Sequence, residues 1–126
     1  MPDVLIVDDE EDICDCLKSV IEDLGCTAKS VMTGDQAIQI LDTEDFRVFV
    51  VDLKLSTSVT GLDVIRAIRT KKPAAVIVAM SGYIDIGLKQ EAEHLKVSDY
   101  LEKPGHLKQE VFAKRIKALL TKGDRQ

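Results

Sequence analysis

Five short apolar segments alternate along this chain with segments of helical spacing, and this alternation limits the possible folds more than any other feature. Three of the apolar runs are almost continuous and rich in Val and Ile, which favours strands that are covered on both faces. The expected strands span residues 4–7, 26–31, 46–51, 74–80 and 99–101. Strands that alternate with helices predict an α/β domain with a parallel sheet and right-handed crossovers.

Helices are expected wherever apolar residues recur three or four positions apart between these strands. They span residues 13–24, 34–41, 61–70, 84–95 and 107–120. Gly25 ends the first helix, and Pro73 ends the connection that follows the third. The fourth helix has the weakest pattern because Gly87 lies inside it, and a glycine there would leave it the softest of the five.

The size and composition of the chain predict one globular domain. The 126 residues are 45% hydrophobic and 31% charged, so we expect a core over about residues 3–120 and a polar tail over 121–126. A net charge of −5, with Lys and Arg scattered, argues against direct nucleic-acid binding. The chain has no apolar run long enough for a membrane span, and its first residues are acidic where a signal peptide is basic. Three cysteines without zinc-like spacing are expected to be free thiols in a reducing cytoplasm.

Polar residues follow four of the five expected strands, at the point where each strand ends. Asp8 and Asp9 follow the first strand, Asp52 the third, Ser81 the fourth and Lys103 the fifth. Open parallel sheets bind ligands outside the carboxyl ends of their strands. We therefore expect three carboxylates, a hydroxyl and an amine to converge at one edge of the sheet.

Each of these residues also has a simpler explanation. Asp8 or Asp9 could cap the first helix, Asp52 could open a turn, Ser81 could cap the fourth helix, and Lys103 could be a solvated surface lysine. Together these explanations are weak, because three neighbouring carboxylates raise one another's pKa and oppose folding. A divalent cation would relieve that repulsion, and a site made of oxygen ligands suits magnesium.

Four motifs match the receiver domains of two-component response regulators in order and in spacing. They are "VDDE" after the first strand, "VVD" at the end of the third, "MSG" after the fourth and "YLEKP" after the fifth. The chain resembles this family from Val4 to about Leu120. The resemblance implies a doubly wound, five-stranded parallel sheet of flavodoxin-like (βα)5 topology, with strand order 2-1-3-4-5.

The resemblance also implies a phosphorylatable signalling switch. Asp52 would accept a phosphoryl group from a phosphohistidine donor. Asp9 and Asp52 would ligate Mg²⁺ directly, Lys54 through its backbone carbonyl and Asp8 through water, and Mn²⁺ could substitute. The donor would be a sensor histidine kinase or a histidine phosphotransfer protein, and the chain itself would not be an enzyme toward other substrates.

Four further features follow from the same resemblance. Ser81 would hydrogen-bond the phosphoryl group, Lys103 would pair with it, and the bond before Pro104 would be cis. Tyr100 would be the switch residue that, with Ser81, changes the surface of the fourth helix, fifth strand and fifth helix. That surface would control a downstream protein or an output domain outside this chain.

The chain departs from the family pattern in the loop after Asp52. Ser56 occupies a position where receivers often carry Pro, and Gly61 comes one residue later than usual. The loop is therefore expected to be longer and more flexible, since no Pro fixes φ. Gly105 stands where the family usually has Phe after Lys-Pro, which is expected to loosen the start of the last helix.

Three other functions compete with the phosphorylated switch. A receiver-like interaction module would keep the fold but take no phosphate, and the complete acid, hydroxyl and lysine set argues against it. A phosphatase of the haloacid dehalogenase type needs a second Asp where this chain has Lys54. A flavodoxin-like nucleotide binder needs a Gly- or Thr-rich phosphate loop after the first strand, which is missing here.

Two bulky side chains are expected to flank the path of a hydrolytic water. Lys54 follows Asp52 by two residues and Tyr83 follows Ser81 by two, and neither is a carboxylate or amide that could orient water. The sequence therefore predicts slow hydrolysis of a phosphoryl group on Asp52.

Overall fold

The computed structural model describes residues 3–56, 58–82, 86–103 and 107–123. It contains one parallel sheet of five strands in the order β2-β1-β3-β4-β5. The strands are β1 (Val4–Val7), β2 (Ala28–Val31), β3 (Val48–Asp52), β4 (Val76–Ser81) and β5 (Asp99–Glu102). The doubly wound, flavodoxin-like topology predicted from the sequence is therefore confirmed.

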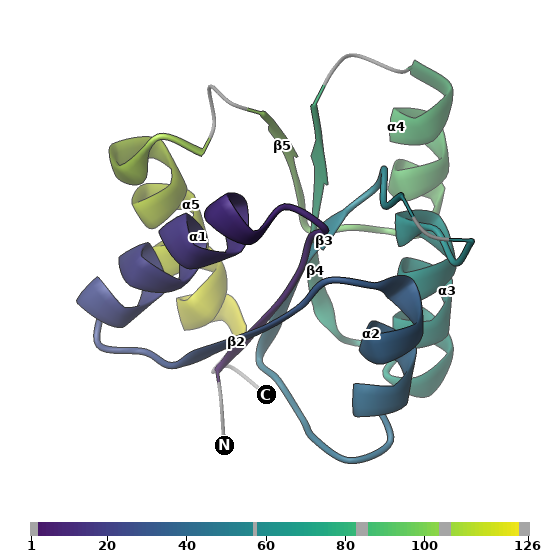
Figure 1. The fold of residues 1–126 in the computed structure, drawn as a ribbon, viewed down its shortest axis with the longest axis horizontal. Coiled ribbons are helices and arrows are strands. Elements are labelled where there is room, and N and C mark those ends of the chain that lie inside the picture. The colour runs from purple at the N-terminus through teal and green to yellow at the C-terminus, as the bar shows by residue number, and fades with distance from the viewer. Residues whose placement is uncertain (1–2, 57, 83–85, 104–106, 124–126) are drawn as a thin grey trace.

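Helices cover both faces of the sheet. They are α1 (Glu11–Asp23), α2 (Gly34–Ile40), α3 (Gly61–Lys71), α4 (Ile86–His94) and α5 (Gln109–Gly123). Helices α1 and α5 lie together on one side of the strands, and α2, α3 and α4 lie on the other (Figure 1). None of the described helices is both long and apolar enough to cross a membrane.

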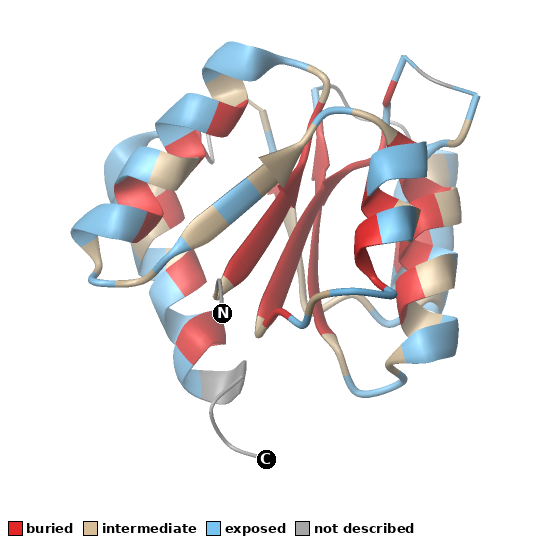
Figure 2. Ribbon diagram, turned by 60° about the horizontal axis from the view of Figure 1, so that its bottom comes forward, coloured by how far each residue is buried: buried red, intermediate tan, exposed pale blue. Residues whose placement is uncertain are grey.

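Alternate residues of each central strand enter two separate hydrophobic cores. In β3, Val48 and Val50 pack with α1 and α5, whereas Phe49 and Val51 pack with α2 and α3. Successive side chains of a strand point to opposite faces, so a continuous apolar run fills both cores at once. Figure 2 shows the result as a sheet whose central strands are buried along their length.

Most boundaries differ from those expected by one to three residues, and three of them illustrate the causes. Strand β2 begins at Ala28 rather than residue 26, since this edge strand is only partly covered. Helix α4 begins at Ile86, and residues 84 and 85 lie outside the described part of the chain. Helix α5 continues to Gly123, so residues 121–123 of the expected polar tail are helical.

The start of α3 is fixed closely against the end of β3. Thr60 caps the helix by accepting from the Asp63 N–H, while the Asp63 carboxylate accepts from the Thr60 N–H. A Cβ on Gly61 would overlap the backbone carbonyl oxygen of Asp52. Only glycine allows this close approach, so Gly61 brings the helix directly against the residue expected to accept phosphate.

Arg69 connects the end of α3 to the segment between α4 and β5. Its guanidinium donates to the carbonyls of Leu95 and Lys96, both at 3.0 Å, and to those of Pro73 and Ala75, both at 2.8 Å. Because one rigid cation satisfies four carbonyl groups, the C-terminal end of α4 is anchored to α3.

Candidate functional site

Two buried carboxylates lie side by side where β1 and β3 end. Val7 of β1 pairs with Val51 of β3, so Asp8 and Asp52 come next on adjacent strands. Asp8 is fully buried and Asp52 is 4% exposed. The Asp8 turn is held further by the Cys14 thiol, which donates to the Asp8 carbonyl at 3.4 Å.

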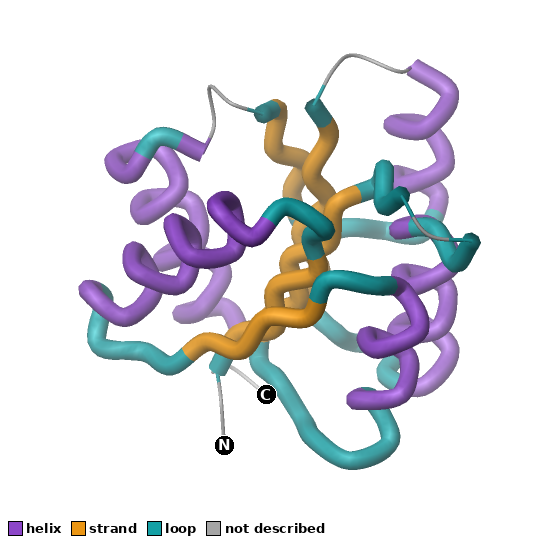
Figure 3. Tube along the Cα trace, viewed as in Figure 1, coloured by secondary structure: helices purple, strands orange, loops and turns teal. Residues whose placement is uncertain are grey.

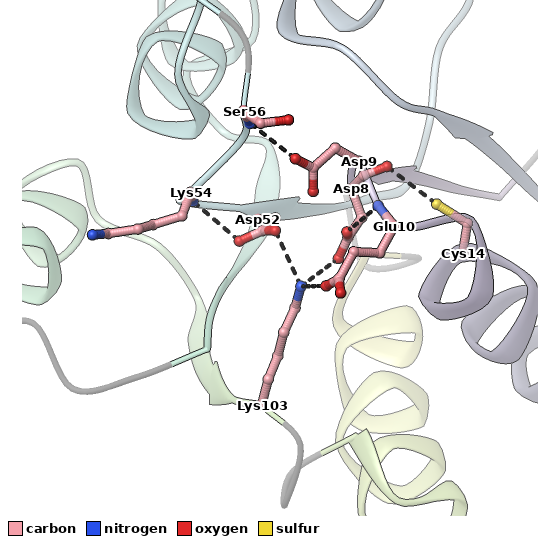
Figure 4. A network of polar contacts seen from close by, with 8 residues as sticks. All are labelled: Asp8, Asp9, Glu10, Cys14, Asp52, Lys54, Ser56 and Lys103. Atoms are coloured by element: carbon pink, nitrogen blue, oxygen red, sulfur yellow. Dashed lines mark hydrogen bonds and ion pairs between the residues drawn. The ribbon is translucent and has the colours of Figure 1, made fainter.

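Lys103 joins these carboxylates through one ammonium group. Its Nζ lies 2.7 Å from Asp8 Oδ2 and 3.0 Å from Asp52 Oδ2, and 3.3 Å from Glu10 Oε2 at the surface (Figure 4). The Lys103 side chain is 9% exposed. Its backbone N–H donates to the Ser81 carbonyl at 2.8 Å, which fixes the lysine beside the end of β4. The expected convergence of strand ends is therefore present for Asp8, Asp52 and Lys103.

Burial and charge shift the pKa values of this group in opposing directions. Burial raises the pKa of Asp52 above its ordinary value, and the Lys103 ammonium only partly offsets this. Burial also lowers the pKa of Lys103, but the hydrogen bonds and charges of Asp8 and Asp52 outweigh it, so that pKa lies above its ordinary value. Lys103 therefore remains charged at neutral pH beside a carboxylate that is costly to ionise.

The loop between β3 and α3 binds two carboxylates through alternate backbone N–H groups. The Lys54 N–H donates to Asp52 Oδ1 at 3.0 Å, and the Ser56 N–H donates to Asp9 Oδ2 at 2.9 Å. Hydrogen bonding by the Ser56 side chain, and then by its backbone, lowers the pKa of Asp9 below its ordinary value. This loop is drawn in teal in Figure 3, directly beyond the end of β3.

The donor set at this edge fits a hard divalent cation. Asp8, Asp9 and Glu10 each offer a carboxylate oxygen, and these oxygens lie within 4.8 Å of one another. Oxygen ligands of this kind are those that Mg²⁺ prefers. The sequence did not predict Glu10 as a ligand. Asp52, which it did predict as a ligand, shares the Lys103 ammonium with Glu10.

The two residues expected to form the switch lie on the neighbouring strands. Ser81 ends β4 and is 1% exposed, one residue beyond the Asp52–Met80 strand pair. Tyr100 of β5 is half-buried, and the Lys89 ammonium lies 5.4 Å from the centroid of its ring. Its hydroxyl is buried and, among the described residues, has no hydrogen-bond partner.

The structure also decides among the simpler explanations of these residues. The N-cap of α1 is Glu10, without a side-chain cap bond, but Asp8 Oδ1 accepts from the Glu10 N–H at 2.9 Å, so Asp8 does bind a backbone donor at the start of that helix. Ser81 lies within β4 and not at the first turn of α4, and the Lys103 side chain is 9% exposed and ion-paired rather than solvated. Asp52 does form a turn-like bond with the Lys54 N–H, in addition to its ion pair. Tyr83, Pro104 and Gly105 lie outside the described residues.

The match to a known protein family covers the strands and the strand-end residues of this site. The model of the response regulator receiver domain matches residues 4–117, which include every strand and all the strand-end residues described above. The chain belongs to this family. RegA, the photosynthetic apparatus regulatory protein of Rhodovulum sulfidophilum, is 36% identical over 82% of this receiver domain and 56% of its own length. An NtrX-like regulator of Rickettsia typhi is 31% identical over 81% of the domain and 22% of its own length.

Solved structures share the fold of this receiver domain. A CheY-like receiver of Methanospirillum hungatei superposes with a TM-score of 0.90 at 21% identity, and the match covers 99% of this chain and 98% of that one. The receiver domain of NtrX from Brucella abortus gives 0.86 at 26% identity, over 94% of this chain and 98% of that one. The domain spans about half of RegA and about a fifth of the NtrX-like regulator, so the remainder of those longer proteins lies outside the match.

Proposed function

We propose that this receiver domain accepts a phosphoryl group on the carboxylate of Asp52 from a phosphohistidine. The observation that supports this most is the buried Asp52 carboxylate, held against the ammonium of Lys103 at the open edge of the sheet. An Asp52 oxygen attacks phosphorus, the phosphorus–nitrogen bond breaks, and the imidazole keeps the electron pair. Alignment and charge stabilisation suffice for such a transfer.

Lys103 and Ser81 are proposed to stabilise the transferred group. The Lys103 ammonium neutralises charge on the phosphoryl oxygens, as it neutralises Asp8 and Asp52 in the unmodified domain. The Ser81 hydroxyl donates to a phosphoryl oxygen, which is a strong charged acceptor. Ser81 ends β4, the neighbour of β3, and Lys103 follows β5, the next strand, from which its ammonium reaches Asp52 Oδ2 at 3.0 Å.

Magnesium would be held by Asp9 and Asp52 directly, by the Lys54 carbonyl, and by Asp8 through water, with Mn²⁺ as a substitute. The close spacing of the carboxylate oxygens of Asp8, Asp9 and Glu10 supports a cation here and adds Glu10 as a further candidate ligand. Bound Mg²⁺ supplies positive charge that offsets the charge on the phosphoryl oxygens.

Asp9→Asn is expected to weaken Mg²⁺ binding while leaving the fold intact. The change removes a charged ligand but keeps an oxygen that can accept the Ser56 N–H. A Mg²⁺ titration followed by amide NMR measures the affinity. An unchanged affinity would remove Asp9 from the ligands that contact the ion.

The test of the proposed function is the intact mass of the domain after incubation with Mg²⁺ and acetyl phosphate. We expect one added phosphoryl group, and no added mass when EDTA is present from the start of the incubation. No added mass would favour the interaction module that takes no phosphate. Steady release of phosphate from an added phosphomonoester would instead indicate a phosphatase.

Phosphorylation is proposed to change the surface formed by α4, β5 and α5. A phosphoryl group on Asp52 would draw Ser81 toward it and open space near Tyr100. Burial of the Tyr100 hydroxyl is costly because no described residue is its hydrogen-bond partner, and an outward rotamer would regain water, so both rotamers are proposed to be accessible. Arg69 anchors the C-terminal end of α4, so we expect the N-terminal end of α4 to move.

Beryllofluoride, which mimics the phosphoryl group, is expected to shift amide NMR signals along α4, β5 and the start of α5. Shifts should extend over residues 84–108 as well as the loops around Asp52. Shifts confined to those loops would contradict the mechanism and leave Tyr100 as a fixed core residue.

The phosphoryl group is expected to be lost slowly. Lys54 and Tyr83 are proposed to obstruct the path of the attacking water. In the unmodified domain the Lys54 side chain extends away from Asp52, so it must swing back to act (Figure 4). The decay rate of the phosphoprotein should rise in the double variant Lys54→Asn, Tyr83→Ala. An unchanged rate would show that obstruction is not the cause.

The proposed partners follow from this chemistry. A sensor histidine kinase or a histidine phosphotransfer protein would be the donor, and a downstream protein or an attached output domain would be the target. Phosphohistidine donors and the free cysteines Cys14, Cys16 and Cys26 both fit the cytoplasm, where we propose that the protein acts.

A further inference from the structure

A backbone hydrogen bond joins the two loops that carry the proposed metal ligands. Asp9 lies in the loop after β1, and Ser56 lies in the loop after β3, two residues beyond the Lys54 carbonyl. The Ser56 N–H donates to Asp9 Oδ2 at 2.9 Å. The same loop holds Asp52 through the Lys54 N–H at 3.0 Å. Alternate N–H groups of one loop therefore orient both carboxylates (Figure 4).

We propose that the backbone N–H of Ser56 is a positioning group that holds the Asp9 carboxylate ready to bind a divalent cation. This inference rests on the proposed function. While Asp9 is bound to Ser56, its carboxylate still offers an oxygen within 4.8 Å of those of Asp8 and Glu10. The hydrogen bond and the cluster of oxygens therefore exist together.

The bond matters because Asp9 is only half-buried. Without a partner, its side chain would sample several rotamers, and binding a cation would have to restrict them. Groups that hydrogen-bond a metal ligand orient it, and their loss weakens metal binding by about 10–100-fold. We expect an effect of that size when the Ser56 donor is removed.

The identity of residue 56 decides whether this donor exists. Every residue except proline carries a backbone N–H, and this chain has Ser56 at a position where receivers often carry Pro. The backbone bond to Asp9 is therefore possible because residue 56 is not proline. The Ser56 side chain also hydrogen-bonds Asp9. A separate variant is therefore needed to distinguish the contribution of the hydroxyl from that of the backbone N–H.

Three variants separate the donor from other effects of a change in this loop. Ser56→Pro removes the N–H and the hydroxyl, and Ser56→Ala removes only the hydroxyl. Ser58→Pro places a proline two residues further along the same exposed loop and leaves the Ser56 donor in place. Thermal unfolding without metal shows whether each variant keeps the stability of the wild-type domain.

Mg²⁺ affinity, measured by amide NMR titration, is expected to fall about 10–100-fold in Ser56→Pro. Ser58→Pro should remain within a few-fold of the wild-type domain, and Ser56→Ala should lose less affinity than Ser56→Pro. A loss in Ser56→Ala as large as that in Ser56→Pro would assign the role to the hydroxyl and overturn the proposal. An affinity of Ser56→Pro equal to that of Ser58→Pro would overturn the proposal. A tighter affinity would also overturn it, because the bond would then compete with the metal.

Hydrogen exchange of the Ser56 amide tests the same bond without altering residue 56. Exchange should be slow in the unmodified domain, remain slow when Mg²⁺ is added, and become faster in Asp9→Ala. Exchange that Asp9→Ala does not change, or that Mg²⁺ accelerates, contradicts the proposal even if Ser56→Pro fails to fold. A failure of the unmodified domain to bind Mg²⁺ would instead overturn the proposed function together with this inference.

Discussion

Replacing Asp52 with alanine is expected to abolish the phosphoryl mass that the wild-type domain gains with Mg²⁺ and acetyl phosphate. Asp52 is the carboxylate at the end of β3, and it is held by Lys103 on one oxygen and the Lys54 N–H on the other. Removing it takes away the nucleophile while leaving Asp8 and Asp9 in place. Asp35→Ala, on the exposed first turn of α2, is the matched control and should take up phosphate as before.

The isosteric variant Asp52→Asn separates loss of the acceptor from loss of the fold. The folded-state pKa of Asp52 lies above its unfolded value because the carboxylate is buried. Ionised Asp52 therefore opposes folding at pH 7, and stability recovers as pH falls through the folded-state pKa. Asp52→Asn should raise the free energy of unfolding at pH 7, with a difference that narrows in acid. Full phosphoryl uptake by either variant would contradict the assignment of Asp52.

Replacing Lys103 with methionine is expected to destabilise the domain by about 3–5 kcal/mol at pH 7, because it leaves buried carboxylates without their cation. Lys103 Nζ lies 2.7 Å from Asp8 Oδ2 and 3.0 Å from Asp52 Oδ2, and the three side chains are almost entirely buried. Urea unfolding measures the difference. Lys108→Met, at an exposed position, should change stability little.

The destabilisation by Lys103→Met should depend on pH in a defined direction. The raised pKa of Lys103 means that its contribution is fully present below the unfolded value of about 10.4 and is lost as pH rises through the folded-state pKa. On the acid side the unpaired carboxylates take up protons, so the deficit should shrink there as well. A deficit that is constant from acid to alkaline pH would indicate lost packing rather than a lost charge.

The sheet was predictable because its strands carry the signal themselves. Apolar residues such as Val48, Phe49, Val50 and Val51 occupy consecutive positions, and only a strand covered on both faces buries all of them. A charge that directly follows such a run must lie at the edge of the sheet. Asp8 and Asp52 follow such runs, and Lys103 follows the short strand β5 at the same edge.

The contacts of Ser56 and Glu10 could not be predicted in the same way. The bond from Ser56 to Asp9 uses a backbone N–H, which every residue but proline has, so only the absence of Pro pointed to it. Glu10 is exposed and pairs with Lys103. It does not directly follow an apolar run, so the sequence pattern did not distinguish it from other surface acids. The end of α5 was placed too early because polar residues 121–123 continue a helix whose apolar face ends at Leu120.

The most direct test of the central claim is to locate the phosphoryl group chemically. Borohydride reduces an aspartyl phosphate to homoserine, which peptide mass spectrometry identifies at its position in the chain. After incubation with Mg²⁺ and acetyl phosphate, we predict homoserine at residue 52 and no conversion of Asp8, Asp9 or Asp35. Homoserine at any of those residues, with Asp52 unchanged, would contradict the account.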